Sequence, residues 1–207
     1  MKRRPETPKA LIYGALALAL SAFAQGADAQ TLDQQWAYCE NRGDAYALDL
    51  QIGGCTGIIQ SGQETQENLA IAFYNRGIAY NRQGDRARAI ADYDQSIRLN
   101  PQFASAYRNR GLAYQNSAPP NYQQAIADAN SAERLAPQDW GPPSDRADVY
   151  LALGNYQQAI SDYTRSIALD PTQEWNFSHR AQAYQALGDT ARAEADRRES
   201  ARLGGGQ

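Results

Sequence analysis

The feature of this sequence that most constrains its fold is an internal repeat of about 34 residues. A small residue recurs at intervals of 34, 36 and 34 residues, and a tyrosine three residues after it recurs at the same intervals. An alanine column and a proline column follow the same period. The four columns are Gly77, Gly111, Ala147 and Ala181; Tyr80, Tyr114, Tyr150 and Tyr184; Ala89, Ala125, Ala159 and Ala193; and Pro101, Pro137 and Pro171. Two extra residues within 116–120 account for the longer interval, and the self-similarity predicts an array of stacked units.

Each unit contains two amphipathic stretches separated by a signal that ends one helix and starts another. Phe73, Gly77 and Tyr80 have the spacing of one helix face. Gly84 and Asp85 follow, a glycine that tolerates the left-handed conformation at a helix end and an aspartate that caps the next helix. A second stretch with helical spacing then runs to a proline. Each unit is therefore expected to be an antiparallel helix pair, too small to bury its apolar face alone.

The repeated pattern resembles the tetratricopeptide repeat (TPR) and covers residues 70–203. Its order is an aromatic residue, Gly or Ala, Tyr, Gly-Asp, Ala, Tyr and Pro. Asn-Arg-Gly at 75–77 and 109–111, with Ala-Ile-Ala-Asp at 89–92 and 125–128, is similar to exported bacterial members of that family. The resemblance implies an all-α fold, a right-handed α-solenoid of about four helix-turn-helix repeats, here preceded by a cysteine-containing helical hairpin.

The chain then divides into seven predicted segments. They are 1–29, a cleaved signal peptide; 30–69, the N-terminal hairpin; 70–103, repeat 1; 104–137, repeat 2 with the insertion; 138–171, repeat 3; 172–203, repeat 4 with a polar capping helix at 190–203; and 204–207, a disordered tail. Pro142 and Pro143 replace the first aromatic of repeat 3 and are expected to shorten its first helix.

The first 29 residues have the order typical of a secretory signal. Lys2, Arg3 and Arg4 precede an apolar run over 10–24, and Ala27-Asp28-Ala29 offers small residues before a cleavage point. The run is shorter than the roughly 20 residues that a spanning helix needs, so an uncleaved anchor is the less favoured alternative. We expect an exported, periplasmic protein without stable membrane insertion after cleavage.

The amino-acid composition disfavours several classes of function. The net charge of −3 argues against a nucleic-acid partner, which usually requires a basic face. One histidine and two cysteines leave little material for a metal site or a thiol catalyst. No catalytic triad or phosphate-binding loop is visible. We therefore expect a non-catalytic protein without a cofactor or a metal.

Two charged columns run through all four repeats. They are Arg76, Arg110, Arg146 and Arg180, and Asp92, Asp128, Asp162 and Asp196. Because the two columns lie at similar heights in an antiparallel pair, each arginine can meet a carboxylate within its unit or in a neighbouring one. A site for an anionic ligand is the alternative, but each arginine is accompanied by its aspartate, which favours a structural ladder of salt bridges.

Cys39 and Cys55 lie 16 residues apart, in a segment that reads as a helix at about 32–40, a turn, and a helix at about 47–60. In an oxidising compartment two such cysteines are expected to pair, which would stabilise the hairpin by roughly 3 kcal/mol. A metal site or a redox-active pair is disfavoured, because no histidine is nearby and the spacing is not Cys-x-x-Cys.

The resemblance also implies a binding surface, because the first helices of successive tetratricopeptide units line a concave groove. The groove residues expected on this basis are Ile71, Tyr74, Asn75, Ile78, Arg82, Arg108, Asn109, Leu112, Asn116, Asp145, Asp148, Trp175, His179 and Gln182. Their apolar members would form a floor for the side chains of a partner. The alternative is that the N-terminal hairpin packs on some of them.

Asn75 and Asn109 occupy equivalent positions, and a row of such amides can bind the backbone of an extended peptide. The row is interrupted at Asp145 and His179, and Arg108 alone does not make the family's basic clamp for a C-terminal carboxylate. The sequence thus predicts a scaffold that binds a peptide or helix of a partner protein of unknown identity. The alternative is a self-associating structural component of the cell envelope, a homo-oligomer.

Overall fold

The computed structural model describes residues 31–204, and all regular elements in this range are helices. They are α2 (Leu32–Glu40), η2 (Arg42–Asp44), α3 (Leu48–Ser61), α4 (Gln66–Arg82), α5 (Arg86–Leu99), α6 (Ala104–Gln115), α7 (Tyr122–Leu135), α8 (Gly141–Ala152), α9 (Tyr156–Leu169), α10 (Glu174–Ala186) and α11 (Thr190–Gly204). The predicted all-α solenoid is confirmed. The predicted signal peptide lies outside the described residues. Gly204, predicted to begin a tail, is instead the last residue of α11.

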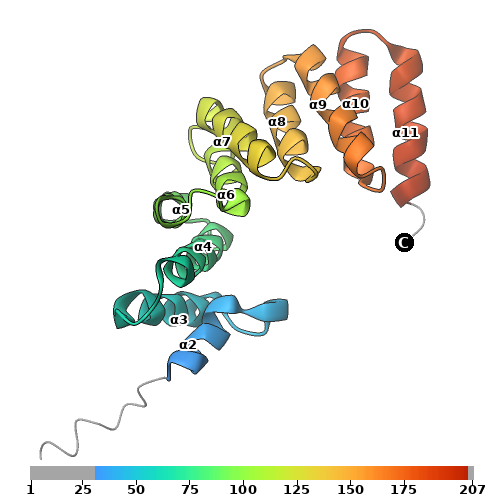
Figure 1. The fold of residues 1–207 in the computed structure, drawn as a ribbon. Coiled ribbons are helices and arrows are strands. Elements are labelled where there is room, and N and C mark those ends of the chain that lie inside the picture. The colour runs from blue at the N-terminus through green and yellow to red at the C-terminus, as the bar shows by residue number, and fades with distance from the viewer. Residues whose placement is uncertain (1–30, 205–207) are drawn as a thin grey trace, which may run out of the picture.

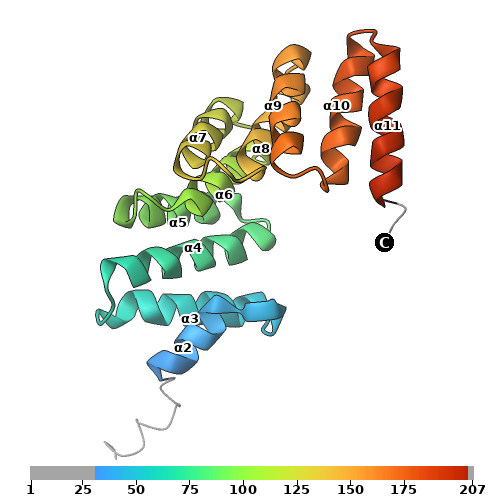
Figure 2. The ribbon, with the colours of Figure 1, turned by 45° about the vertical axis from the view of Figure 1, so that its right-hand side comes forward.

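The helices stack as successive antiparallel pairs along an open curve (Figures 1 and 2). Each pair contacts the next, and the first helices of neighbouring repeats also contact one another directly, α4 with α6, α6 with α8 and α8 with α10. These contacts place the first helices on the inner side of the curve. Within residues 31–204 no helix is both long and apolar enough to cross a membrane.

The close approach of the two helices in a repeat depends on the small-residue columns. A Cβ atom on Gly77 would lie 2.7 Å from Cε1 of Tyr93, which is 1% exposed. Gly111 is similar, since a Cβ atom there would lie 3.2 Å from Cβ of Asp128 and 3.3 Å from the carbonyl oxygen of Ala125. The recurring glycine is thus the position at which the second helix crosses the first.

The first helix of repeat 3, α8, has 12 residues, as many as α6 and fewer than the 17 of α4 and the 13 of α10. Pro142 and Pro143 lie in the first turn of α8 and are buried. The amide hydrogens of a first turn have no partner within the helix, so a proline there removes no helical hydrogen bond. The expected shortening holds relative to α4 and α10 and not relative to α6, and the prolines start the helix without interrupting it.

The arginine and aspartate columns pair in every repeat, as predicted. Nε and Nη2 of each arginine donate to the two carboxylate oxygens of its aspartate over 2.6–2.8 Å. Nη1 reaches back to the preceding pair of helices. Its acceptors are Thr56 for Arg76, Asp94 for Arg110, Asn130 for Arg146 and Thr164 for Arg180. Each guanidinium therefore joins three helices and sets the stacking of one repeat on the next.

The N-terminal hairpin stacks on the array as an additional helix pair. Its second helix, α3, has the same 14 residues as α5, and Thr56 accepts from Arg76 as Asp94 accepts from Arg110. When α3 is laid over α5 end to end, Cys55 falls on Tyr93 and Cys39 on Gly77.

The predicted disulfide between Cys39 and Cys55 is confirmed, and both cysteines are fully buried. By the same alignment it occupies, in the hairpin, the place of the Gly77–Tyr93 contact in repeat 1. A covalent bond thus joins the two helices at the point where a glycine and a tyrosine join them in the repeats.

Candidate functional site

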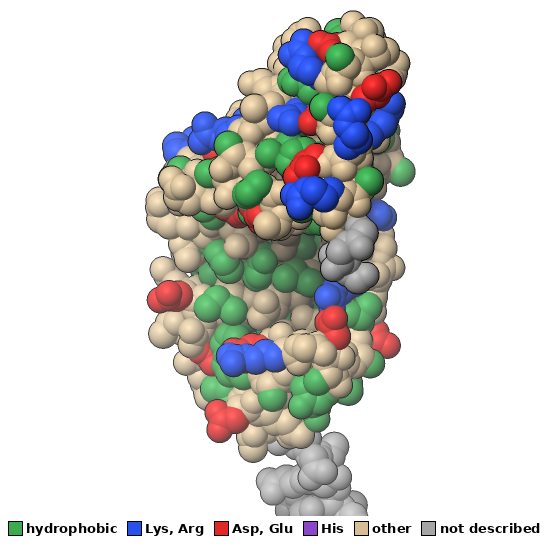
Figure 3. All heavy atoms as spheres, turned by 90° about the vertical axis from the view of Figure 1, so that its right-hand side faces the viewer, with side chains coloured by type: hydrophobic (Ala, Val, Ile, Leu, Met, Phe, Trp, Pro, Cys, Tyr) green, Lys and Arg blue, Asp and Glu red, His purple; other side chains and the backbone are tan. Residues whose placement is uncertain are grey.

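The inner side of the curve is the candidate site. Figure 3 views this side and shows a hollow between the two ends of the array, with hydrophobic side chains on its floor. The first helices that line it are tied together by hydrogen bonds and ion pairs from one repeat to the next. Each of these contacts involves residues that the sequence had placed in the groove.

The first contact joins repeats 1 and 2. Nδ2 of Asn109 donates to the hydroxyl oxygen of Tyr74 over 3.0 Å, and the Tyr74 ring packs on Phe103 with centroids 4.7 Å apart. Burial raises the pKa of the Tyr74 hydroxyl, so the group stays neutral. One amide hydrogen of Asn109 is thereby committed to Tyr74, and the predicted asparagine row is not a set of free amides.

The second contact joins repeats 2 and 3. Nε of Arg108 donates to Asp145 over 2.6 Å, and Nη2 donates to the other carboxylate oxygen over 3.3 Å. The guanidinium also lies over the Trp140 ring, 5.5 Å from its centroid. It passes against Gly141, where any Cβ atom would collide with it. Burial raises the pKa of Asp145 to about 6, although Arg108 opposes this shift.

The third contact joins repeats 3 and 4. Nδ1 of His179 lies 2.9 Å from Oδ1 of Asp148, and the hydroxyl of Tyr163 donates to the same oxygen over 2.5 Å. The Asp148 hydrogen bond raises the pKa of His179 against the opposing effect of burial. The side chains of His179, Asp148 and Tyr163 thus form a polar cluster that joins the two repeats.

The other predicted groove residues are placed as follows. Ile71, Ile78 and Leu112 are half-buried, and Gln182 is exposed. Trp175 is 41% exposed and packs edge-on against Trp140, with ring centroids 5.4 Å apart. Asn116 donates to the backbone carbonyl of Leu112, the backbone carbonyl oxygen of Asn75 accepts a hydrogen bond from Gln51, and Arg82 pairs with Asp44. The last two contacts come from the N-terminal hairpin, which thus engages the repeat 1 end of this side. Ile78 packs on the cluster of Ala89, Tyr93 and Ala113.

Sequence reasoning missed several residues of this face. Tyr163 belongs to a second helix, yet its hydroxyl reaches Asp148 on a first helix. Trp140 precedes α8 and receives both Arg108 and Trp175. Tyr163 stands where repeat 1 has Tyr93, a position that signals only a buried ring, so its polar contact could not be read from the sequence. In residues 31–204, no group of three or more His, Cys, Asp or Glu side chains is arranged to hold a metal.

The geometry defines the class of the protein as a helical-repeat solenoid with a preformed inner face. Comparison with known families agrees: the family model described as tetratricopeptide repeat matches residues 70–103, and one described as TPR repeat matches 147–188. The chain is a tetratricopeptide-repeat protein. A comparison with curated protein sequences gives no match.

Solved structures of MamA share this fold. The chain aligns with MamA 41-end from Desulfovibrio magneticus RS-1 at a TM-score of 0.70 and 19% identity, covering 84% of this chain and 97% of that one. A crystal structure of MamA aligns at a TM-score of 0.69 and 20% identity, covering 81% of this chain and 92% of that one. At this level of identity the likeness shows the fold alone.

Proposed function

We propose that the protein is an exported, non-catalytic scaffold that holds an extended peptide or a helix of a partner protein on its inner face. The observation that carries this proposal is the set of contacts between successive first helices. Tyr74 with Asn109, Arg108 with Asp145, and Asp148 with His179 tie each repeat to the next. A surface held in this way is ordered before a partner arrives, which lowers the entropic cost of binding.

Half-buried apolar side chains supply the anchors. Ile71, Ile78 and Leu112 lie among the polar contacts of the first helices and would receive the side chains of the partner. Export rests on the leader-like order of residues 1–29. A purified protein whose mass still includes those residues would contradict export.

The test is capture from an envelope extract with the chain from residue 30 onward. The baits are the wild type, Leu112→Asp, and a control, Ala127→Asp, which adds the same charge at an exposed position of α7. All three are first checked for equal melting temperature. A protein retained by the wild type and the control but lost by Leu112→Asp supports the proposal.

Equal recovery by all three baits would move the binding site away from the inner face. A wild-type mass in solution that rises with concentration, without capture of a second protein, would favour the self-associating alternative instead.

A further inference from the structure

In repeat 1, two guanidinium groups share one tyrosine ring. Arg88 lies over Tyr80, with its central carbon 4.4 Å from the ring centroid, and Arg76 of the ladder lies 5.9 Å from it. Arg88 is held in place by Asp85 at the start of the second helix, whose carboxylate accepts from its Nε over 2.5 Å. The outer arginine thus covers the tyrosine and is oriented by an aspartate three residues before it.

Repeat 4 has the same arrangement. Arg192 lies 4.6 Å from the centroid of Tyr184, and Arg180 of the ladder lies 5.8 Å from it. Asp189 accepts from Nε of Arg192 over 2.5 Å. Because the arrangement recurs at the two ends of the array, the position over the tyrosine is a place that this fold fills with a guanidinium.

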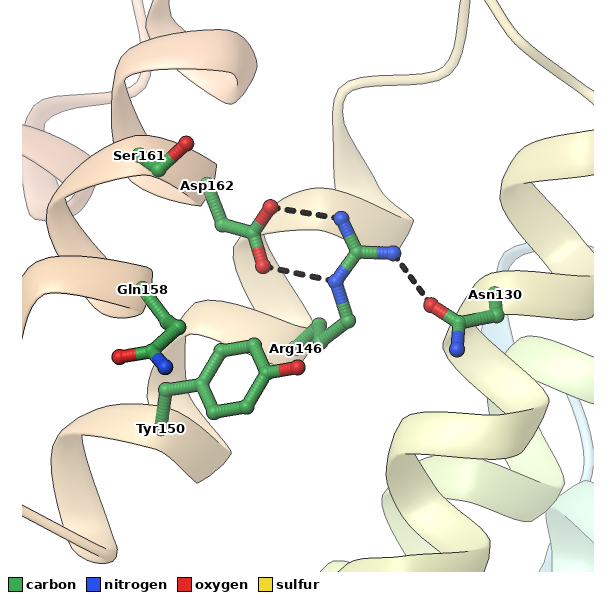
Figure 4. Close-up of a pocket in the computed structure, with 6 residues that line it drawn as sticks. All are labelled: Asn130, Arg146, Tyr150, Gln158, Ser161 and Asp162. Carbon is green, nitrogen blue, oxygen red and sulfur yellow. Dashed lines mark hydrogen bonds and ion pairs between the residues drawn. The ribbon is translucent and has the colours of Figure 1, made fainter. Parts of the chain in front are cut away.

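Repeat 3 keeps the tyrosine and the ladder arginine but lacks the outer arginine. Tyr150 and Arg146 stand at the first two positions, whereas Gln158 stands where repeat 1 has Arg88, and Asn155 where it has Asp85. The space is open. A pocket of about 220 Å³ lies there (Figure 4), lined by Asn130, Arg146, Tyr150, Gln158, Ser161 and Asp162.

The charged groups around the pocket are already paired with one another. Nε and Nη2 of Arg146 are bound to Asp162, and Nη1 is bound to Glu133 over 2.7 Å and to Asn130 over 2.5 Å. Glu133 also pairs with Arg165. Two carboxylates therefore balance two guanidinium groups. Four of the five N–H groups of Arg146 are thus engaged, so the guanidinium cannot offer the pair of donors that an anion binds best.

The remaining lining groups suit a guanidinium. The Tyr150 ring offers an aromatic surface for stacking, and the Gln158 side chain, which carries a neutral oxygen acceptor, lies next to it, while the Ser161 hydroxyl lies at the Asp162 end of the pocket (Figure 4). A guanidinium stacks on aromatic rings and donates to several oxygens in one plane. None of these residues takes part in the three contacts of the inner face.

We propose that this pocket is a binding site for the guanidinium of an arginine side chain on a partner protein. The incoming arginine takes the place over Tyr150 that Arg88 and Arg192 take over the tyrosines of their own repeats. The site is separate from the proposed groove, and its test does not depend on that groove.

The test uses N-acetyl-arginine N-methylamide as the probe, titrated into the ¹⁵N-labelled protein and followed by NMR. The expected result is a saturable set of shifts centred on Tyr150, Gln158 and Ser161. The citrulline analogue has nearly the same shape without the charge, and should bind at least about fivefold more weakly. Equal binding of the two probes, or shifts scattered over the surface, would overturn the proposal.

A pair of variants localises the effect. Asn155→Asp with Gln158→Arg rebuilds the aspartate and arginine of repeat 1 and should fill the pocket from within, so that probe binding is lost while the melting temperature is kept or raised. Asn121→Asp with Gln124→Arg makes the same change in repeat 2, beside Tyr114 and Arg110, and should leave the probe-induced shifts at Tyr150, Gln158 and Ser161 as in the wild type. Undiminished binding to the filled variant, or equal loss in both, would contradict the assignment.

Discussion

Arg146 of α8 and Asp162 of α9 form two parallel hydrogen bonds, of 2.7 Å from Nε and 2.6 Å from Nη2. The same pair recurs in every repeat, and the third nitrogen of each arginine reaches the preceding helix pair. The carboxylates in this column are buried, so the arginine supplies the hydrogen bonds that water would otherwise provide. The ladder thus couples the fold of one repeat to its stacking on the next.

Replacement of Arg110 by leucine should therefore destabilise the array. Asp128 is 3% exposed, burial already raises its pKa, and loss of Arg110 leaves its carboxylate without its main partner. Removal of one member of a buried ion pair typically costs about 3–5 kcal/mol. Urea unfolding of Arg110→Leu measures the loss. The double variant Arg110→Leu, Asp128→Leu should recover much of it, and a single variant as stable as the wild type would rule out a structural ladder.

The glycine at the helix crossing should not tolerate a methyl group. Gly77→Ala places a Cβ atom 2.7 Å from the Tyr93 ring, and overpacking of this kind costs roughly 1–3 kcal/mol. Gly53 is the control, because it lies within α3 and a Cβ atom there meets nothing within 4 Å. Gly53→Ala should gain up to about 1 kcal/mol from helix propensity. Thermal unfolding compares the two, and equal effects would argue against the close crossing.

Asp145 should make stability fall as pH rises. Its pKa is raised to about 6 by burial, above the usual value near 3.9, so the native state binds the proton more tightly than the unfolded chain. Between about pH 4 and pH 6 this group contributes stability that is lost as pH increases. Asp145→Asn removes that dependence. The wild type minus variant difference in unfolding free energy, measured across this range, should decline with pH, and a flat difference would contradict the assignment.

The pKa of His179, the single histidine of the sequence, reports on the contact between repeats 3 and 4. Its pKa is raised by Asp148, so His179 should titrate above its ordinary value of 6.5. Folding stability from this pair is fully present below pH 6.5 and declines as pH rises through the folded pKa. NMR titration of the imidazole measures this value. Asp148→Asn should lower it, and an unchanged titration would mean that the two side chains are apart in solution.

Much of the fold could be predicted from the sequence because it depends on local and periodic features. The glycine and tyrosine columns, the Gly84–Asp85 break and the pairing of Arg76 with Asp92 all lie within one repeat. Helical periodicity and the antiparallel packing of two adjacent helices set the neighbours there. Cys39 and Cys55 could be paired for a similar reason, since they lie on adjacent helices of one hairpin. The effect of the two prolines of α8 depended on where that helix begins, and a repeat pattern locates helix ends poorly.

The inner face could be predicted only as a set of residues. Arg108 and Asp145 were both assigned to it, but their ion pair depends on how far one repeat rotates relative to the next. Tyr163 reaches Asp148 by crossing from a second helix, a contact that no spacing along the chain encodes.

The sequence by itself thus determined the repeated helix pair, the disulfide hairpin and the salt-bridge ladder, because helical periodicity brings those residues together within a unit or between adjacent units. Only the tertiary structure decided which groove residues are already engaged with one another, and that the place over Tyr150 is open. The physical reason is that both depend on how each repeat packs on the next. That packing is set by many side-chain contacts together.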